Sequence, residues 1–193
     1  PVVRAGAGAV SLSRTAATAA RVLSQLRRDP RTVALLLVVP CVLMILVDQL
    51  FAGRELVFQS VGVPMLGLFP LISMFLVTSI TMLRERTTGT LERLLTTPLT
   101  KLELLLGYGI AFATVAIVQA VVVSVVGFGL LGLQAQHSEI VIMLLAVANA
   151  ILGMAFGLFV SAFARTEFQA VQFMPAFVLP QILLCGLFVA RDQ

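Results

Sequence analysis

Charged residues divide this sequence into long apolar runs separated by short polar segments. Five runs contain almost no charge, and they cover residues 32–52, 61–83, 104–131, 140–164 and 168–190. An α-helix rises 1.5 Å per residue, so about 20 residues cross the roughly 30 Å hydrocarbon core of a bilayer. Strands of a membrane β-barrel need only about 10 residues of alternating polarity, which these runs do not show. The pattern therefore predicts five transmembrane helices in one all-α, polytopic helical membrane domain over residues 1–193.

The composition supports this prediction and excludes two other classes of protein. Apolar residues make up 60% of the chain and charged residues 11%, and the mean hydropathy is +1.08. An ordinary soluble domain has roughly 45–50% apolar and about 25% charged residues. A disordered chain combines low hydrophobicity with high charge. Neither class fits this sequence.

The basic residues predict how the spans are oriented. Segments that follow the first, third and fifth runs lie on one side of the membrane, and they contain only Arg54 and Arg191. The other eleven of the 13 lysine and arginine residues lie on the side of the amino terminus. Basic residues favour the cytoplasmic side. We therefore expect a multi-pass plasma-membrane protein with a cytoplasmic amino terminus and the end of the fifth span outside. Because the basic residues flank apolar runs, we expect them to meet anionic lipid and not nucleic acid.

Residues 11–28 are predicted to form an amphipathic helix that lies in the membrane interface and ends before Pro30. Apolar residues share one face of this helix: Leu12, Ala16, Ala19, Leu23 and Leu26. Arg14, Arg21 and Arg28 recur every seven residues on the opposite face. An apolar stripe opposite a basic stripe is typical of an interfacial helix. The pattern is compatible with a lipid anchor and with a surface that also contacts a cytoplasmic partner.

The segment after the second run combines charge with a short leucine pattern. Gly89 is expected to break the chain before a short helix in which Leu91, Leu94 and Leu95 share a face, and Pro98 is expected to end that helix. Thr100 and Glu103 have the spacing of a capping box at the start of the third span. From the residues alone, this segment is either a solvated loop or a docking helix.

The spans themselves contain small and uncharged polar residues. In the fourth span Gly153 and Gly157 lie on a face of small residues, which predicts close helix packing, with a lining of a transport path as the alternative. Gln119 and Asn149 are the candidates for contact with a transported molecule. Asp48, Glu103, Glu139 and Glu167 lie near span ends, whereas an ion-coupled transporter usually has an ionisable residue near the membrane midplane.

Catalytic chemistry is not readable in this sequence. A phosphate-binding loop requires the pattern G-x-x-x-x-G-K-[S/T], and the single lysine, Lys101, is followed by leucine. Cys41, Cys185 and His137 are too far apart along the sequence for the clustered ligand spacing of a metal site. We therefore expect no enzyme active site, metal site or resident cofactor on this chain.

Two segments resemble the ABC-2 type transporter permease family of bacterial drug, lipid and polysaccharide exporters. Residues 84–108 contain the family pattern in Arg84-Glu85-Arg86, Gly89-Thr90-Leu91-Glu92, Thr97-Pro98-Leu99, Glu103 and Gly107. Residues 161–188 resemble the fifth helix of the same family. The resemblance implies a type V exporter-like transmembrane domain with six spans, of which five are present here, so we expect a fragment or shortened product.

The resemblance also implies how the chain works. Residues 84–98 would form a coupling helix that docks on a separate ABC ATPase subunit, which would hold ATP and magnesium, and residues 11–28 would lie beside it. The implied contact residues are Arg84, Glu85, Arg86, Gly89, Thr90, Leu91, Glu92, Arg93, Leu94 and Pro98. With a second permease chain, identical or related, the expected function is ATP-driven export of an apolar or amphipathic drug or lipid. An ion-coupled secondary transporter or a channel subunit is the alternative, and a membrane anchor for an enzyme complex is a third.

Overall fold

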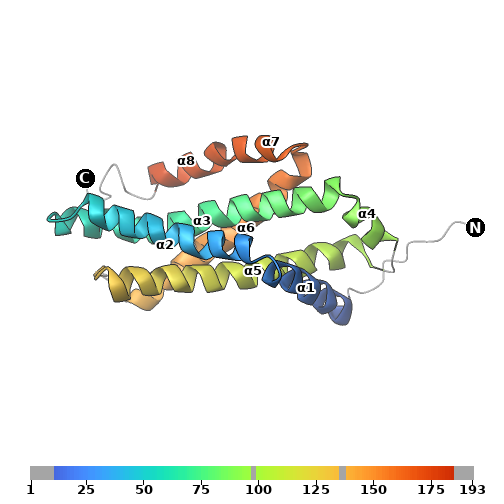
Figure 1. The fold of residues 1–193 in the computed structure, drawn as a ribbon, viewed down its shortest axis with the longest axis horizontal. Coiled ribbons are helices and arrows are strands. Elements are labelled where there is room, and N and C mark those ends of the chain that lie inside the picture. The colour runs from blue at the N-terminus through green and yellow to red at the C-terminus, as the bar shows by residue number, and fades with distance from the viewer. Residues whose placement is uncertain (1–10, 97–98, 135–137, 185–193) are drawn as a thin grey trace, which may run out of the picture.

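The structure is a computed structural model that describes residues 11–96, 99–134 and 138–184. Its helices, in chain order, are α1 (Leu12–Arg27), α2 (Pro30–Leu50), α3 (Glu55–Thr87), α4 (Thr90–Leu95), α5 (Lys101–Val125), the π-helix η1 (Val126–Leu130), α6 (Glu139–Phe163), α7 (Glu167–Gln172) and α8 (Met174–Leu184). The described ranges contain no strand. Figure 1 shows an elongated bundle with α1 and α4 at one end and the turn between α2 and α3 at the other. The predicted all-α fold is confirmed.

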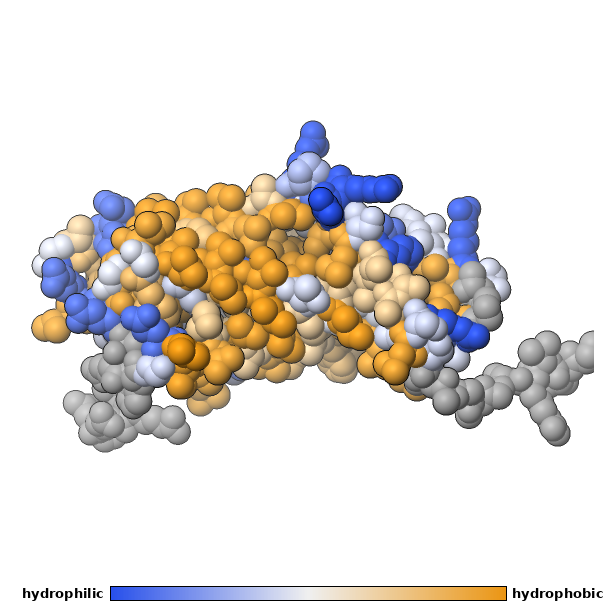
Figure 2. All heavy atoms as spheres, turned by 90° about the horizontal axis from the view of Figure 1, so that it is seen from below, coloured by the Kyte–Doolittle hydropathy of each residue, from blue (hydrophilic) through white to orange (hydrophobic). Residues whose placement is uncertain are grey.

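Four of these helices are long and apolar enough to cross a membrane. They are Pro30–Leu50, Glu55–Thr87, Lys101–Leu130 and Glu139–Phe163, and they correspond to the first four apolar runs. In Figure 2 an apolar belt covers the left and central part of the molecule, and hydrophilic residues lie at its left end and over its right-hand part. Large apolar side chains such as Leu35, Leu46 and Leu144 point outward, as expected where lipid is the solvent. The chain is therefore a polytopic helical membrane protein.

The fifth predicted span, residues 168–190, is not one continuous helix in the described part of the chain. It consists of α7 and α8, which are separated at Phe173, and residues 185–190 lie outside the described ranges. The proline ring at Pro175 would clash with the carbonyl group four residues earlier, at Val171. Pro175 is instead accommodated in the first turn of α8, where its missing N–H leaves no helical bond unmade.

α1 ends at Arg27, before Pro30 as predicted, and Pro30 has a second role that was not predicted. It occupies the first turn of α2. Asp29 caps α2, because its carboxylate accepts bonds from the Thr32 backbone N–H (3.3 Å) and hydroxyl (2.7 Å). These hydrogen bonds lower the pKa of Asp29 below its usual value. A proline with φ near −65° suits the first turn of a helix, where its N–H would be unpaired anyway.

The core forms where α6 packs along α3, the most extensive helix contact in the described structure. A Cβ atom at Gly153 would lie 2.9 Å from the Leu71 Cα, and a Cβ at Gly157 would lie 2.7 Å from the Phe75 carbonyl oxygen. Both glycines thus place the α6 backbone directly against the α3 backbone. This contact is the geometry in which small residues drive helix association in lipid.

The end of the third span departs from α-helical geometry. Residues Val126–Leu130 form a π-helical turn, in which the Leu131 N–H bonds the Val126 carbonyl at 3.1 Å. Gly127 lies in this turn, and a Cβ there would come within 2.7 Å of the Leu66 side chain. The wider turn therefore brings the α5 backbone close to α3 before the chain reverses toward α6.

Candidate functional site

The segment that matches the family pattern is divided between two helices. Residues Arg84 to Thr87 continue α3, and the break occurs at Gly89, which has φ +73° and precedes α4. The coupling helix predicted over residues 84–98 is therefore not one helix, because residues 84–87 belong to α3. The predicted break at Gly89 before a short helix is confirmed, and that short helix is the six-residue α4. Polar residues can continue a helix past the end of an apolar run, whereas a left-handed φ interrupts it, and glycine adopts that φ at no steric cost.

Five of the ten predicted ATPase-contact residues lie in α4, namely Thr90, Leu91, Glu92, Arg93 and Leu94. Thr90, Leu91 and Glu92 form its first turn. The Arg93 side chain is exposed, and Leu94 is half-buried against the core. Pro98 lies outside the described residues.

Two arginines at the end of α3 contact the end of α6 and the start of α7. The Arg84 guanidinium donates two hydrogen bonds to Glu167, from Nε to Oε1 at 2.6 Å and from Nη2 to Oε2 at 3.3 Å. Arg86 donates to the Ser161 carbonyl oxygen near the end of α6. The Arg84 pair lowers the pKa of Glu167 below its usual value. These side chains therefore connect the helix that precedes α4 to the start of α7.

Glu85, between these arginines, turns inward toward α1 and α5. Its Oε1 lies 4.0 Å from Nη2 of Arg21. The same Nη2 donates to the Tyr108 hydroxyl oxygen at 2.5 Å, and the guanidinium carbon lies 5.7 Å from the centre of the Tyr108 ring. Arg21 of α1 thus contacts both α3 and α5, a link between distant segments that sequence reasoning did not predict.

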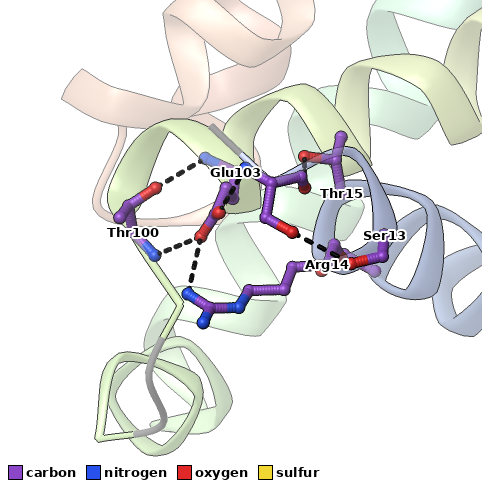
Figure 3. A network of polar contacts seen from close by, with 7 residues as sticks. Ser13, Arg14, Thr15, Thr100 and Glu103 are labelled. Atoms are coloured by element: carbon purple, nitrogen blue, oxygen red, sulfur yellow. Dashed lines mark hydrogen bonds and ion pairs between the residues drawn. The ribbon is translucent and has the colours of Figure 1, made fainter. Parts of the chain in front are cut away.

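Glu103 joins α1 to the start of α5, as Figure 3 shows. Its Oε2 accepts from the Thr100 backbone N–H at 2.8 Å, and the Thr100 hydroxyl accepts from the Glu103 N–H at 3.2 Å. The predicted capping box is therefore confirmed. The other carboxylate oxygen, Oε1, accepts from the Ser11 N–H at 2.8 Å. Nη1 of Arg14 lies 4.0 Å from Oε2. This buried carboxylate thus caps α5 and also contacts the start of α1.

The face that α1 buries differs from the predicted leucine stripe. Its buried residues are Thr15, Thr18, Ala19 and Val22, whereas Leu12 and Ala16 are exposed. The physical reason is a close approach to α5 at Gly107, where a Cβ would lie 2.6 Å from the Thr18 side chain. Gly107 in the apolar run was the signal for this approach. The exposed part of the leucine stripe is left for the membrane interface, and Arg28 is exposed.

The polar residues predicted for a transport path lie between helices. Gln119 of α5 is fully buried, and its amide donates to the Leu36 carbonyl oxygen in α2 at 2.9 Å and to the Ser73 hydroxyl in α3. Asn149 of α6 lies against Gly67 of α3, where a Cβ would come within 2.7 Å of the Asn149 amide nitrogen. Both side chains therefore contribute to helix packing, and their contact with a transported molecule stays a prediction. Among the described residues, no three metal-binding side chains gather.

Comparison with known proteins places this arrangement in a family. The model of the ABC-2 type transporter family matches residues 14–193. The probable multidrug ABC transporter permease YbhR of Escherichia coli (strain K12) is 30% identical over 122 residues, which are 63% of this chain and 33% of the relative. The corresponding permease of Escherichia coli O157:H7 has the same identity and coverage.

The chain thus covers about a third of the length of these curated relatives. No solved structure matches it. The family match nonetheless extends from α1 through α4 to α8 and covers nearly the whole bundle. Together with the four membrane-spanning helices, this match shows that the chain belongs to the ABC-2 type transporter family.

Proposed function

We propose that this chain is the membrane-spanning permease subunit of an ATP-driven exporter, in which α4 docks on a separate ABC ATPase subunit. The observation that carries the proposal is the position of α4. This short helix follows the left-handed Gly89, connects two spans, and lies at the same end of the bundle as α1 (Figure 1). ATP and magnesium would be held by the partner, so this chain would contribute movement and not hydrolysis.

The contacts around α4 supply a route for that movement. The end of α3 is bonded to the α6–α7 region through Arg84 and Arg86. The start of α5 is bonded to α1 through Glu103. A displacement of α4 by the ATPase would therefore move two helix ends that are each hydrogen-bonded to a further helix. Rigid helices joined by such bonds can transmit a local shift across a bundle.

Three further parts of the proposal rest on chemistry and on the relatives. The eleven-to-two distribution of basic residues supports an amino terminus and an α4 on the cytoplasmic side of the plasma membrane. A relative described as a multidrug permease, and spans without charge near their midpoints, support an apolar or amphipathic drug or lipid as the exported molecule. A second permease chain would complete the path.

The test compares variants at the two ends of the bundle in the full natural chain, co-expressed with its ATPase. Gly89→Val forces a β-branched residue into the left-handed region at Gly89, and Arg93→Ala removes an exposed charge from α4. Truncating one partner of a buried interfacial charge pair costs about 2–5 kcal/mol. We therefore expect both variants to reach the membrane, to retain less ATPase in a pull-down and to export less. Arg54→Ala, at the opposite end, is the matched control and should behave as wild type.

Two results would contradict the proposal. Normal export and normal ATPase retention in both α4 variants would return the segment to a solvated loop. Export that persists without ATP and stops when the proton gradient is collapsed would favour the ion-coupled alternative.

A further inference from the structure

A cavity of about 210 Å³ lies where α1, the start of α2, α3 and α5 meet. Its lining carries charges of both signs, from Asp29, Arg84 and Glu85, together with the Thr32 and Tyr108 hydroxyl groups. A water molecule needs only about 10–15 Å³ of such volume. The cavity is therefore large enough for several water molecules or for a small group that carries one positive and one negative charge.

The carboxylate of Glu85 offers this cavity an unfilled hydrogen-bond acceptor. Its Oε1 lies near Arg21, but its Oε2 is buried and has no hydrogen-bond partner among the described residues. A buried acceptor without a donor is costly, so a donor entering the cavity would be bound favourably. Arg84 donates two of its five N–H groups to Glu167, which leaves guanidinium donors for an anionic oxygen.

The cavity lies at the level where the helices change from polar to apolar. In α2 Val33 is the first apolar residue after the polar Thr32, and in α3 the apolar run ends at Leu83, directly before Arg84. Beyond this level α2 exposes large side chains such as Leu35 and Val38. A molecule with its polar head in the cavity would thus lay apolar chains along α2, which is the shape of a membrane lipid.

We propose that this cavity binds the head group of a zwitterionic phospholipid whose ammonium carries N–H donors, as in phosphatidylethanolamine. The ammonium donates to Oε2 of Glu85 and lies near the Asp29 carboxylate, and the phosphate accepts from Arg84. A simple cation fits less well, because Arg84 lines the cavity and Arg21 lies beside Glu85. A trimethylated ammonium has no N–H to donate to Glu85, and a glycerol head group has no positive charge for either carboxylate. This inference does not rest on the export function.

The experiment titrates the purified full chain in detergent with short-chain lipids and measures binding by native mass spectrometry and thermal stabilisation. The probes are dioctanoyl phosphatidylethanolamine, phosphatidylcholine and phosphatidylglycerol, and glycerophosphoethanolamine as the head group without chains. We expect phosphatidylethanolamine to bind at least about tenfold more tightly than the other three, the effect of one charge-assisted hydrogen bond. Glu85→Gln should lose this preference, whereas Glu139→Gln, at the start of α6, should retain it.

Asp29→Asn provides a second variant at an exposed position, in case Glu85→Gln does not fold, and it should weaken phosphatidylethanolamine binding without unfolding the chain. Equal binding of the three lipids by the wild-type chain would overturn the proposal. So would an unchanged preference in the folded carboxylate variants. Binding of the chain-free head group as tightly as the lipid would show that the ligand is a soluble molecule and not a lipid.

Discussion

Replacing Gly153 with alanine adds a single methyl group at the closest approach of α6 to α3. The new Cβ would lie 2.9 Å from both the Cα and the carbonyl carbon of Leu71. Backbone atoms cannot rotate away as the tip of a side chain can, so α6 must shift or the helices must separate. We expect this one substitution to destabilise the bundle although alanine is the better helix former.

Two opposing free energies decide the size of the effect. Alanine is favoured over glycine in a helix interior by about 1 kcal/mol, while overpacking a close contact typically costs about 1–3 kcal/mol. Gly109, in the interior of α5, separates these contributions, because a Cβ built there has no atom within 4 Å beyond its chain neighbours and the nearby backbone of its own helix. Gly109→Ala should therefore gain about 0.5–1 kcal/mol. The difference in unfolding free energy between the two variants should be about 1–3 kcal/mol.

The assay is equilibrium unfolding of the purified chain in mixed micelles with increasing dodecyl sulfate, followed by circular dichroism. The expected order of stability is Gly109→Ala first, wild type second and Gly153→Ala last. If Gly153→Ala were as stable as Gly109→Ala, close backbone packing would not hold α6 to α3, and the reasoning from the small-residue face would fail.

Three further predictions address the α1–α4 end of the bundle. Glu167→Gln should lower the free energy of unfolding at pH 7 by about 0.2–1 kcal/mol, because both side chains of the Arg84–Glu167 pair are more than a third exposed. The pKa of Glu167 is lowered in the folded chain, so this contribution is present above the usual value of 4.5 and is lost as the pH falls below it. Thermal melts in which the difference between wild type and variant did not close in acid would disprove the assignment. Thr100→Ala should cost about 0.5–2 kcal/mol in the same melts, because it removes the hydroxyl that caps α5, and an unchanged melting temperature would show that the cap contributes nothing. In intact cells, an impermeant thiol reagent should label Arg54→Cys but not Arg93→Cys, and the opposite result would reverse the proposed orientation.

Much of the helical framework could be predicted from residue order alone. A bilayer requires continuous apolar segments of sufficient length, so the runs at 32–52, 61–83, 104–131 and 140–164 mark the four spanning helices. The capping box at Thr100 is likewise local, since its two partners are three residues apart. Features that depend on neighbours in sequence can be read from the sequence, and the start of α5 is an example.

The contacts of the candidate site could not be predicted in this way. The Arg84–Glu167 pair joins residues 83 positions apart, and Arg21 meets Tyr108 across 87 positions. Periodicity placed Arg21 on the basic face of its helix, opposite the apolar stripe, but the pattern of a single helix contains no information about which other helix lies beside it. The sequence also did not show that residues 84–87 continue α3, since their charges could belong either to a loop or to the end of that helix.

The sequence by itself thus determined an all-α membrane protein, the first four of its five predicted spans and the small-residue face of α6, because the lipid environment acts on each segment independently. Only the tertiary structure decided which face of α1 is buried, that α7 and α8 are separate helices, and that Glu85 turns inward beside a cavity. Those features depend on long-range packing. In α1, for example, the close approach to α5 at Gly107 determines which face is buried, and the apolar stripe does not. Packing between distant segments is a property of the folded bundle, and no single stretch of the chain specifies it.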